Sequence, residues 1–392
     1  MRFFRLALLG VAAAAPAAAQ QVEFSGVLQG DIGYGSNPLL RAGVTGSTGQ
    51  ASGSFAPRLI YRTAKSSTTL AGAYSRQQYF THFGYTDSLR ASLVRTDQVT
   101  EYLSSTIQGS FSSTNRATID TFADIGNEPL NIGRRTYRST GQYQLQYQAS
   151  ARDQFSYSAG IEHLAYGKNS TSTGLPGFGA SSYTQYSVNG GYNRVVDPRT
   201  TIGAQISLMA VRSELYPDSR TISPSLTVKR QLTAIWEVDG HVGVVFQHIG
   251  GSFPSSSTNL SYGLNACAAY PRTHFCASAE HATTASGFGA LRKNTSVSAN
   301  LTEELTEKSR LALSANYSRS SSDTSLIGLG LPISARNTRT RAVIATVRYD
   351  RDLSRRISAG VGGNYQWRRT AISGSGRAIS ATIHVTAKLG RL

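Results

Sequence analysis

Apolar and polar residues alternate along most of this chain, most clearly at its C-terminal end. Between residues 377 and 389, polar residues separate the apolar positions Ile379, Ala381, Ile383, Val385, Ala387 and Leu389. A period of two places alternate side chains on opposite faces of a β-strand, whereas a helix would spread both sets around its circumference. The segment is therefore predicted to be a strand with one apolar and one polar face.

The two preceding segments, 343–349 and 357–367, show the same alternation and are joined by a polar turn around Arg351–Arg355. Tyr349, Tyr365 and Trp367 lie on the apolar phase near the ends of these segments. Transmembrane β-barrels place girdles of aromatic residues at the two membrane interfaces, and their strands are longer than those of most soluble sandwiches. These features predict strands of a transmembrane barrel.

The remainder of the chain repeats this pattern, so we predict an all-β fold, a transmembrane antiparallel β-barrel of about 16 strands, with 14 or 18 as alternatives. Short polar turns are expected near Lys65, Gln98, Arg152, Asp197, Thr233, Glu307 and Leu353. Longer Ser/Gly/Asn-rich loops are expected between them, the longest at 249–293. Short periplasmic turns that alternate with long extracellular loops are typical of outer-membrane barrels, and both termini should lie at the short-turn side.

The first residues have the pattern of a signal peptide. Arg2 and Arg5 precede a short apolar run, and Ala17–Ala19 provides small residues for cleavage. The apolar run is shorter than a membrane-spanning helix, which disfavours the alternative of an uncleaved anchor. We therefore expect residues 1–19 to be a signal peptide and residues 20–392 to form one barrel domain in the cell outer membrane.

The chain has 39 Lys and Arg against 22 Asp and Glu, a formal net charge of +17. In an exported protein the expected partners of this charge are outer-membrane lipid, lipopolysaccharide or acidic polysaccharide, and no nucleic acid. The polar phase of the predicted strands carries basic residues that would line the lumen, which are Arg58, Arg138, Lys229, Arg310, Arg348, Arg368 and Lys388.

These basic residues allow two interpretations. In the first, they pair across the barrel wall with acidic residues of the same phase, which are Glu23, Asp31, Glu162, Glu237 and Asp239. In the second, they form a slightly cationic channel that favours anions. The second interpretation predicts a narrow, weakly anion-preferring pore whose selectivity depends on Arg138, Lys229, Arg348 and Arg368, with the 249–293 segment as the plug.

Cys267 and Cys276 are the only cysteines and lie in the longest predicted loop. In an oxidising compartment they are expected to form a disulfide. A metal site with His274 is the alternative, although the spacing matches no recognised motif. No Gly-x-Ser-x-Gly or His-Glu-x-x-His motif is present, although Asp239 and His241 share a face and could reach each other. We predict no cofactor, no metal and no enzymatic activity, with an outer-membrane enzyme as a third possibility.

One segment suggests a family. Residues 30–38 read Gly-Asp-Ile-Gly-Tyr-Gly-Ser-Asn-Pro. This resembles the Gly-Tyr-Asp-Ser-Asn-Pro element near the mature N-terminus of outer-membrane β-barrel porins associated with bacterial exopolysaccharide biosynthesis, with Gly35 in place of the Asp. The resemblance implies a barrel that takes part in exopolysaccharide or capsule export or assembly, without catalytic residues. A diffusion porin for small, anionic solutes is the alternative function.

Overall fold

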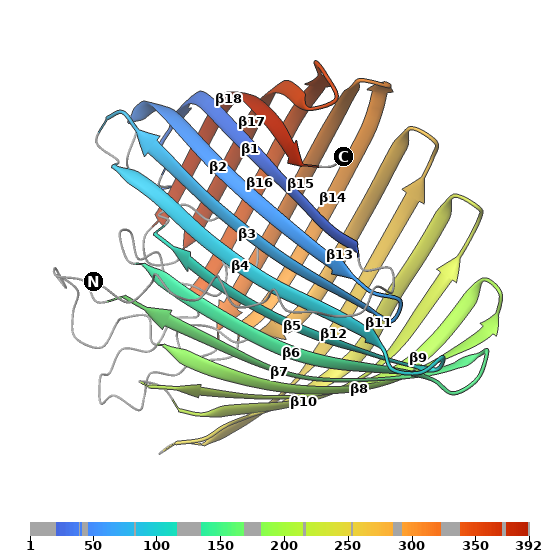
Figure 1. Ribbon diagram of the computed structural model, residues 1–392. Coiled ribbons are helices and arrows are strands. Elements are labelled where there is room, and N and C mark those ends of the chain that lie inside the picture. Colours follow the sequence, from blue (N-terminus) through green and yellow to red (C-terminus); the bar gives the residue numbers. More distant parts are fainter. Residues whose placement is uncertain are drawn as a thin grey trace, which may run out of the picture.

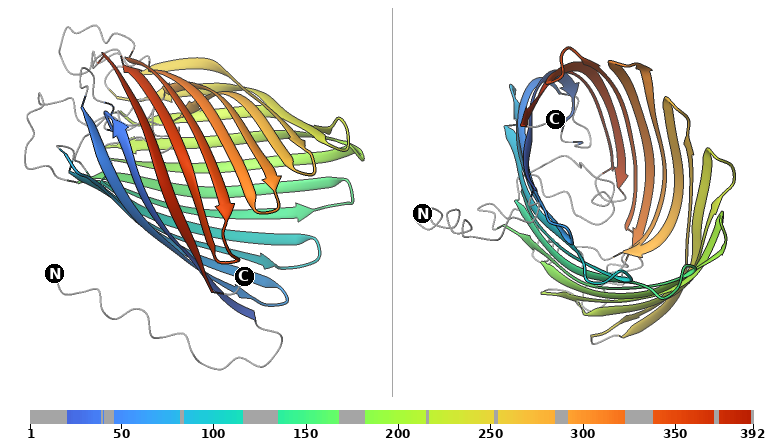
Figure 2. Two further views of the ribbon diagram at one scale, coloured as in Figure 1. Left: turned by 90° about the horizontal axis from the view of Figure 1, so that it is seen from above. Right: turned by 45° about the vertical axis from the view of Figure 1, so that its right-hand side comes forward.

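The computed structural model describes residues 21–38, 40, 46–81, 84–115, 135–167, 182–214, 217–251, 254–284, 292–322, 338–370 and 374–390. Within these ranges the chain forms a single 18-stranded antiparallel sheet. β1 pairs with β18 as well as with β2, so the sheet closes on itself as a barrel (Figures 1 and 2). In the described residues no helix is long and apolar enough to cross a membrane.

The strands follow one another around the barrel in chain order. They are β1 (Gln21–Ser36), β2 (Ser47–Arg62), β3 (Ser66–Tyr79), β4 (Tyr85–Gln98), β5 (Leu103–Thr114), β6 (Thr136–Gln148), β7 (Asp153–Tyr166), β8 (Tyr183–Asp197), β9 (Thr200–Ser213), β10 (Ser219–Gln231), β11 (Trp236–Ile249), β12 (Ser255–Ala269), β13 (Thr273–Thr284), β14 (Arg292–Thr306), β15 (Ser309–Ser322), β16 (Thr338–Asp352), β17 (Ile357–Thr370) and β18 (Gly374–Gly390). This confirms the predicted fold class, with 18 as the strand count. Residues 1–19, the expected signal peptide, lie outside the described residues.

The alternation of the sequence becomes the two faces of the barrel wall. In β18, Ile383 is 65% exposed and Val385 51%, whereas His384 between them is 3% exposed. Large apolar side chains are exposed in the same alternating way on the other strands. In an outer-membrane barrel this outer face is solvated by lipid rather than water, because the barrel interior is too polar to bury it. The apolar residues therefore form an outer band instead of a central core.

The connections differ between the two ends of the barrel. At one end, which we call the short-turn end, the strands are joined by residues 63–65, 99–102, 149–152, 198–199, 232–235, 270–272, 307–308 and 353–356. β1 begins and β18 finishes at this end, because Gln21 lies opposite Arg62 and Gly390 opposite Ser25. The opposite end, the long-loop end, carries the other connections between the described strands, and all of these except residues 371–373 are longer than the short turns. Seven of the short turns are at the predicted positions, and the turn at 270–272 is additional.

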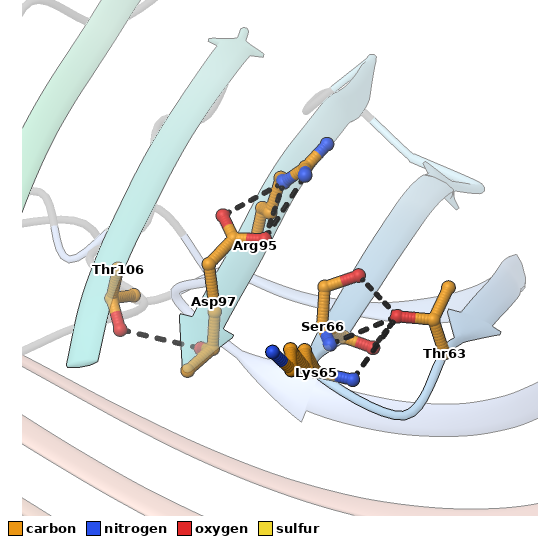
Figure 3. A network of polar contacts seen from close by, with 7 residues as sticks. Thr63, Lys65, Ser66, Arg95, Asp97 and Thr106 are labelled. Carbon is orange, nitrogen blue, oxygen red and sulfur yellow. Dashed lines mark hydrogen bonds and ion pairs between the residues drawn. The ribbon is translucent and has the colours of Figure 1, made fainter. Parts of the chain in front are cut away.

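A recurring side-chain hydrogen bond stabilises the short turns (Figure 3). In the first of them, the Thr63 hydroxyl oxygen accepts a hydrogen bond from the amide of Ser66 at 3.0 Å. Ser150, Thr233 and Ser354 each accept from the amide three residues further on in their own turns. Ser and Thr hydroxyls favour such turns because they satisfy backbone amides that leave the strand ladder.

The segment 249–293 was predicted as one long extracellular loop, and this prediction is wrong. It contains the hairpin of β12 and β13, which turns at residues 270–272. The outward positions of β12 pass from Leu264 to Ala266 and Ala268, so the contrast between the two phases fades towards the turn. Because the outward and inward residues differ little in hydrophobicity here, the alternation of a strand was not recognised in the sequence.

Cys267 and Cys276 lie directly opposite each other in this hairpin and form a disulfide, with their Cα atoms 4.1 Å apart. They lie near the short-turn end, so the bridge is not in an extracellular loop as expected. Cys267 lies on the inner phase, next to the Asn265 side chain. The other short turns have a hydroxyl or, at Asp197, a carboxylate that accepts from a backbone amide, whereas the hairpin that turns at residues 270–272 is fixed by the disulfide.

We predict that the protein migrates faster on SDS gels when unheated than when heated, and that it fractionates with outer membranes. The closed sheet has no free edge at which detergent-driven unfolding can start, so the unheated barrel should stay compact. Recovery as a soluble periplasmic protein with heat-independent mobility would contradict the barrel.

The second prediction concerns the disulfide. Thiol labelling of unreduced, denatured protein should detect no free cysteine. The variant C267S/C276S should still form the heat-modifiable barrel, with a loss of stability of about 2–3 kcal/mol at most, because a short loop constrains little of the unfolded chain. The readout is the temperature at which the compact gel form disappears. Failure of this variant to form any compact barrel would show that the bridge is needed for folding, contrary to expectation.

Candidate functional site

The inner wall of the barrel is the candidate site, since it is the polar face that a solute would meet. All seven predicted basic residues lie on the inner phase of their strands. Leu59, the neighbour of Arg58 along β2, is exposed on the apolar outer face, so Arg58 lies on the inner face. Arg58 also lies opposite Ser25, which belongs to the inner phase of β1. Arg348 follows it because its neighbour Val347 is exposed on the outside.

Three of these residues, Arg138, Lys229 and Arg310, pair with acidic side chains of the neighbouring strand, and the first two do so at short distance. On β6, the Arg138 guanidinium lies 2.9 Å from a carboxylate oxygen of Glu162 on β7. The Tyr183 hydroxyl of β8 donates a hydrogen bond to the other oxygen of Glu162 at 3.2 Å. On β10, the Lys229 ammonium lies 2.9 Å from Glu237 of β11.

The largest group of inner charges lies on β14–β18 near the short-turn end, and we call it the luminal charge cluster. Its members are Glu304, Arg310, Arg348, Asp350, Asp352, His384 and Lys388. Arg310 lies 3.7 Å from Glu304, and Arg348 donates to both oxygens of Asp350 at 2.8 and 3.0 Å. Apart from His384, the cluster lines a hollow of about 370 Å³ on the inner wall. Three of the seven predicted residues are thus brought together.

A glycine makes one contact of this cluster possible. His384 on β18 reaches across β17 to Asp350 on β16, with Nε2 and Oδ1 2.7 Å apart. Gly360 lies between them in the register, opposite both residues. A Cβ at Gly360 would overlap the imidazole ring, so only glycine leaves room for the side chain to lie over the strand. The same arrangement occurs where the ring of His241 lies over Gly263.

The inner wall is crowded at the long-loop end. Arg368 of β17 is 7% exposed and Arg292 of β14 is 3% exposed, and the two guanidinium groups lie close enough for their charges to repel. Nearby, Leu40 from the β1–β2 connection packs against Ala342 and Ala378 of the inner wall. The predicted plug was the 249–293 segment, which forms strands. The described contact that narrows the lumen at this end is made instead by Leu40, in the connection between β1 and β2.

Considered together, the inner phase carries almost balanced charge. The basic residues of the described strands on this phase are Arg58, Arg62, Arg90, Arg138, Lys229, Arg292, Arg310, Arg348, Arg368 and Lys388. The acidic residues are Glu23, Asp31, Glu162, Glu237, Asp239, Glu280, Glu304, Asp350 and Asp352. The geometry supports the first interpretation for four of the seven predicted cations, since Arg138, Lys229, Arg310 and Arg348 form ion pairs within the wall. Within the described part of the chain, no ion pair is formed by Arg58, Arg62, Arg90, Arg368 or Lys388.

Sequence reasoning missed several inner charges, among them Arg90, Glu280, Glu304 and Asp350. Glu304 and Asp350 lie just beyond the ends of the predicted strand segments, so extending each count would have identified them. Arg90 lies on the polar phase within a predicted strand, and Glu280 lies in the segment that was expected to be a loop. Arg292 was missed because β14 begins earlier than expected.

Metal binding and catalysis find no support in the geometry. Both cysteines are in the disulfide, which removes the thiolates that the metal alternative with His274 needs. Among the described residues, no group of three or more His, Cys, Asp or Glu side chains could hold a metal ion. The Asp239 carboxylate accepts a hydrogen bond from the Asn265 side chain at 2.9 Å, and the described contact of this carboxylate is therefore with Asn265 rather than with His241.

No protein-family model matches the chain, and no curated protein sequence matches it either. The structure is similar to that of the FrpB iron transporter from Neisseria meningitidis, with 8% sequence identity, a TM-score of 0.50, and coverage of 89% of this chain. This chain spans only 62% of the transporter. A BenF-like porin from Pseudomonas fluorescens shows 11% identity, a TM-score of 0.49, and coverage of 94% and 99% of the two chains.

OccK2 of Pseudomonas aeruginosa, solved in complex with glucuronate, shows 10% identity and a TM-score of 0.49 over 95% of this chain and 98% of its own. At identities this low the similarity concerns the fold alone. The closed antiparallel sheet, its exposed apolar outer face and its asymmetric connections are those of outer-membrane β-barrels, and they point to the outer membrane as the location of this protein.

Proposed function

We propose that this protein is an outer-membrane channel through which small hydrophilic solutes diffuse. The observation that carries the proposal is a closed barrel of 18 strands whose inner wall is polar along its length. Barrels of 16 to 18 strands are wide enough to leave an aqueous channel, whereas barrels of about eight strands are filled by their own side chains. A polar wall lowers the cost of transferring a hydrated solute into such a channel.

The pairing of the inner charges sets the expected selectivity. A cation held about 3 Å from a carboxylate acts on a passing ion mainly as a dipole, so its field is weaker than that of an isolated charge. Arg138, Lys229 and Arg348 are held in this way. We therefore propose a weaker preference for anions than the net charge of +17 suggests. Arg58, Arg368 and Lys388, which form no ion pair with the described residues, are the predicted cations that would favour anions locally.

The role in exopolysaccharide export remains a prediction that rests on residues 30–38. In the structure, the glycines of this segment have a local explanation. A Cβ at Gly33 would overlap the backbone of Ala381, and one at Gly35 would press on Ser380. Both contacts lie where β1 meets β18, so these glycines permit the closing strands to approach. The closure of the barrel accounts for them whether or not a polysaccharide is transported.

The proposal predicts that the purified protein conducts ions in planar bilayers with weak selectivity. Separate variants can remove either the negative or the positive members of the inner ion pairs. E162Q/E237Q releases Arg138 and Lys229, and should move the reversal potential in a low-salt gradient towards anion selectivity. R138Q/K229Q releases the two carboxylates and should move it the opposite way by a similar amount. Both shifts should fade as salt rises from millimolar towards molar, because the Debye length shrinks from about 30 Å at 0.01 M to about 3 Å at 1 M.

The matched control is R95Q/D97N, which removes an ion pair from the outer face of β4 and should leave the reversal potential unchanged (Figure 3). Two outcomes would count against the proposal. One is a correctly inserted wild-type barrel that never conducts. The other is conduction with reversal potentials that neither inner pair of substitutions alters.

A further inference from the structure

Three arginines form a row on the outer face of the barrel at the long-loop end. Arg319 of β15 lies directly opposite Arg341 of β16, and Arg341 lies directly opposite Arg369 of β17. All three have the outward parity of their strands. We call this set the arginine row. Neighbouring strands are about 4.7–4.9 Å apart, so the row places three positive charges within about 10 Å along the outer surface.

The arginine row places three like charges directly opposite one another on neighbouring strands, and none of the three has an acidic partner among the described residues. Like charges placed directly opposite each other across strands are destabilising, so such a row calls for a counter-charge. Elsewhere on the outer face the protein supplies one. Arg135 lies 2.8 Å from Asp87, and Arg95 lies 2.9 Å from Asp97. In the part of the chain that the structure describes, no ion pair is formed by any arginine of the row, which leaves the counter-charge to come from outside.

The depth of the row in the membrane indicates where that counter-charge lies. One step towards the middle of the barrel, the outward positions are Tyr317, Val343 and Trp367, which lie opposite one another in the register. Tyr and Trp are enriched at the boundary between acyl chains and head groups. The arginine row lies just beyond this boundary, at the long-loop end, which faces outwards in barrels of this kind. It is therefore at the level of the head groups of the outer leaflet.

A shallow apolar groove lies further towards the middle of the membrane, beyond the row of Tyr317, Val343 and Trp367. Small residues leave a hollow of about 540 Å³ on the outer face of β14–β17. Ala299, Ala315 and Ala345 lie opposite one another in three successive strands. Gly363 of β17 lies one outward position nearer the short-turn end. Leu313 and Val347 also line the groove, beside Gly363. An extended acyl chain fits such a surface, which is apolar, narrow and open to lipid.

We propose that the arginine row and this groove together bind one phosphorylated glycolipid of the outer leaflet. Its phosphates accept hydrogen bonds from the guanidinium groups, and one acyl chain lies along the alanine groove. Arg binds phosphate through two parallel hydrogen bonds, which a row of three can offer to a head group with more than one phosphate. This site is separate from the lumen and does not depend on whether the channel conducts.

The test uses the full-length protein in mild detergent, stripped of lipid and titrated with diphosphorylated lipid A, with bound lipid counted by native mass spectrometry. R319Q/R341Q/R369Q should weaken binding by at least about tenfold, because the loss of a single charge-assisted hydrogen bond already accounts for a factor of this size. R319K/R341K/R369K, which keeps the charges, should retain most of the binding. Lipid A without phosphates should bind poorly to the wild type.

The matched control is R351Q/R355Q/R356Q, which removes three positive charges from the end of β16 and the turn that joins it to β17, at the short-turn end, and should bind as the wild type does. Heat-dependent mobility on gels establishes that each variant is folded. The proposal is overturned if the Gln variant of the row binds like the wild type, if both triple variants lose binding equally, or if phosphate-free lipid A binds as well as the phosphorylated form. It is also overturned if millimolar inorganic phosphate displaces the lipid, or if the groove is occupied by a second copy of the chain and no lipid is retained.

Discussion

The requirement to pair every backbone amide and carbonyl away from water governs this structure. Inside a bilayer an unpaired sheet edge would cost several kcal/mol per group, so a sheet that spans it must close. Closure here depends on the contact between β1 and β18, which pair from Ser25 to Ser36. Gly33 and Gly35 allow this contact, since a side chain at either position would press on β18. The first and last strands of the chain thus complete the hydrogen bonding of all the others.

Closure also divides every strand into two chemically separate faces, and the protein treats charge differently on each. On the inside, Arg138 and Lys229 each face a carboxylate of the next strand. On the outside, at the long-loop end, Arg319, Arg341 and Arg369 face only one another. The positive balance of the sequence is therefore a poor guide to the lumen, where acidic residues nearly match basic ones. Much of the excess lies on the outer surface, where lipid head groups are the available anions.

The fold was predictable because one physical rule, the alternation imposed by a wall between lipid and water, acts on every strand. It identified the barrel, the inner phase of all seven basic residues, and the turns at which hydroxyl side chains cap the chain. It failed at β12 and β13, because alanine near Cys267 gives almost no contrast between the faces. The sequence also did not predict which side chains pair with one another on the inner face. Whether Glu162 lies beside Arg138 depends on the register of β6 and β7, which the alternation leaves free in steps of two residues.

The contact between His384 and Asp350 shows what such register decides. The two residues lie on strands that are not neighbours, and only the glycine between them at position 360 brings them within 2.7 Å. A bulkier residue there would keep the imidazole off the strand and leave Asp350 to Arg348 alone. The wall of this barrel is consequently more than a set of independent strands. At Arg348, Asp350 and His384 the luminal charges are linked across three strands, so the substitution of one of them changes the field of the others.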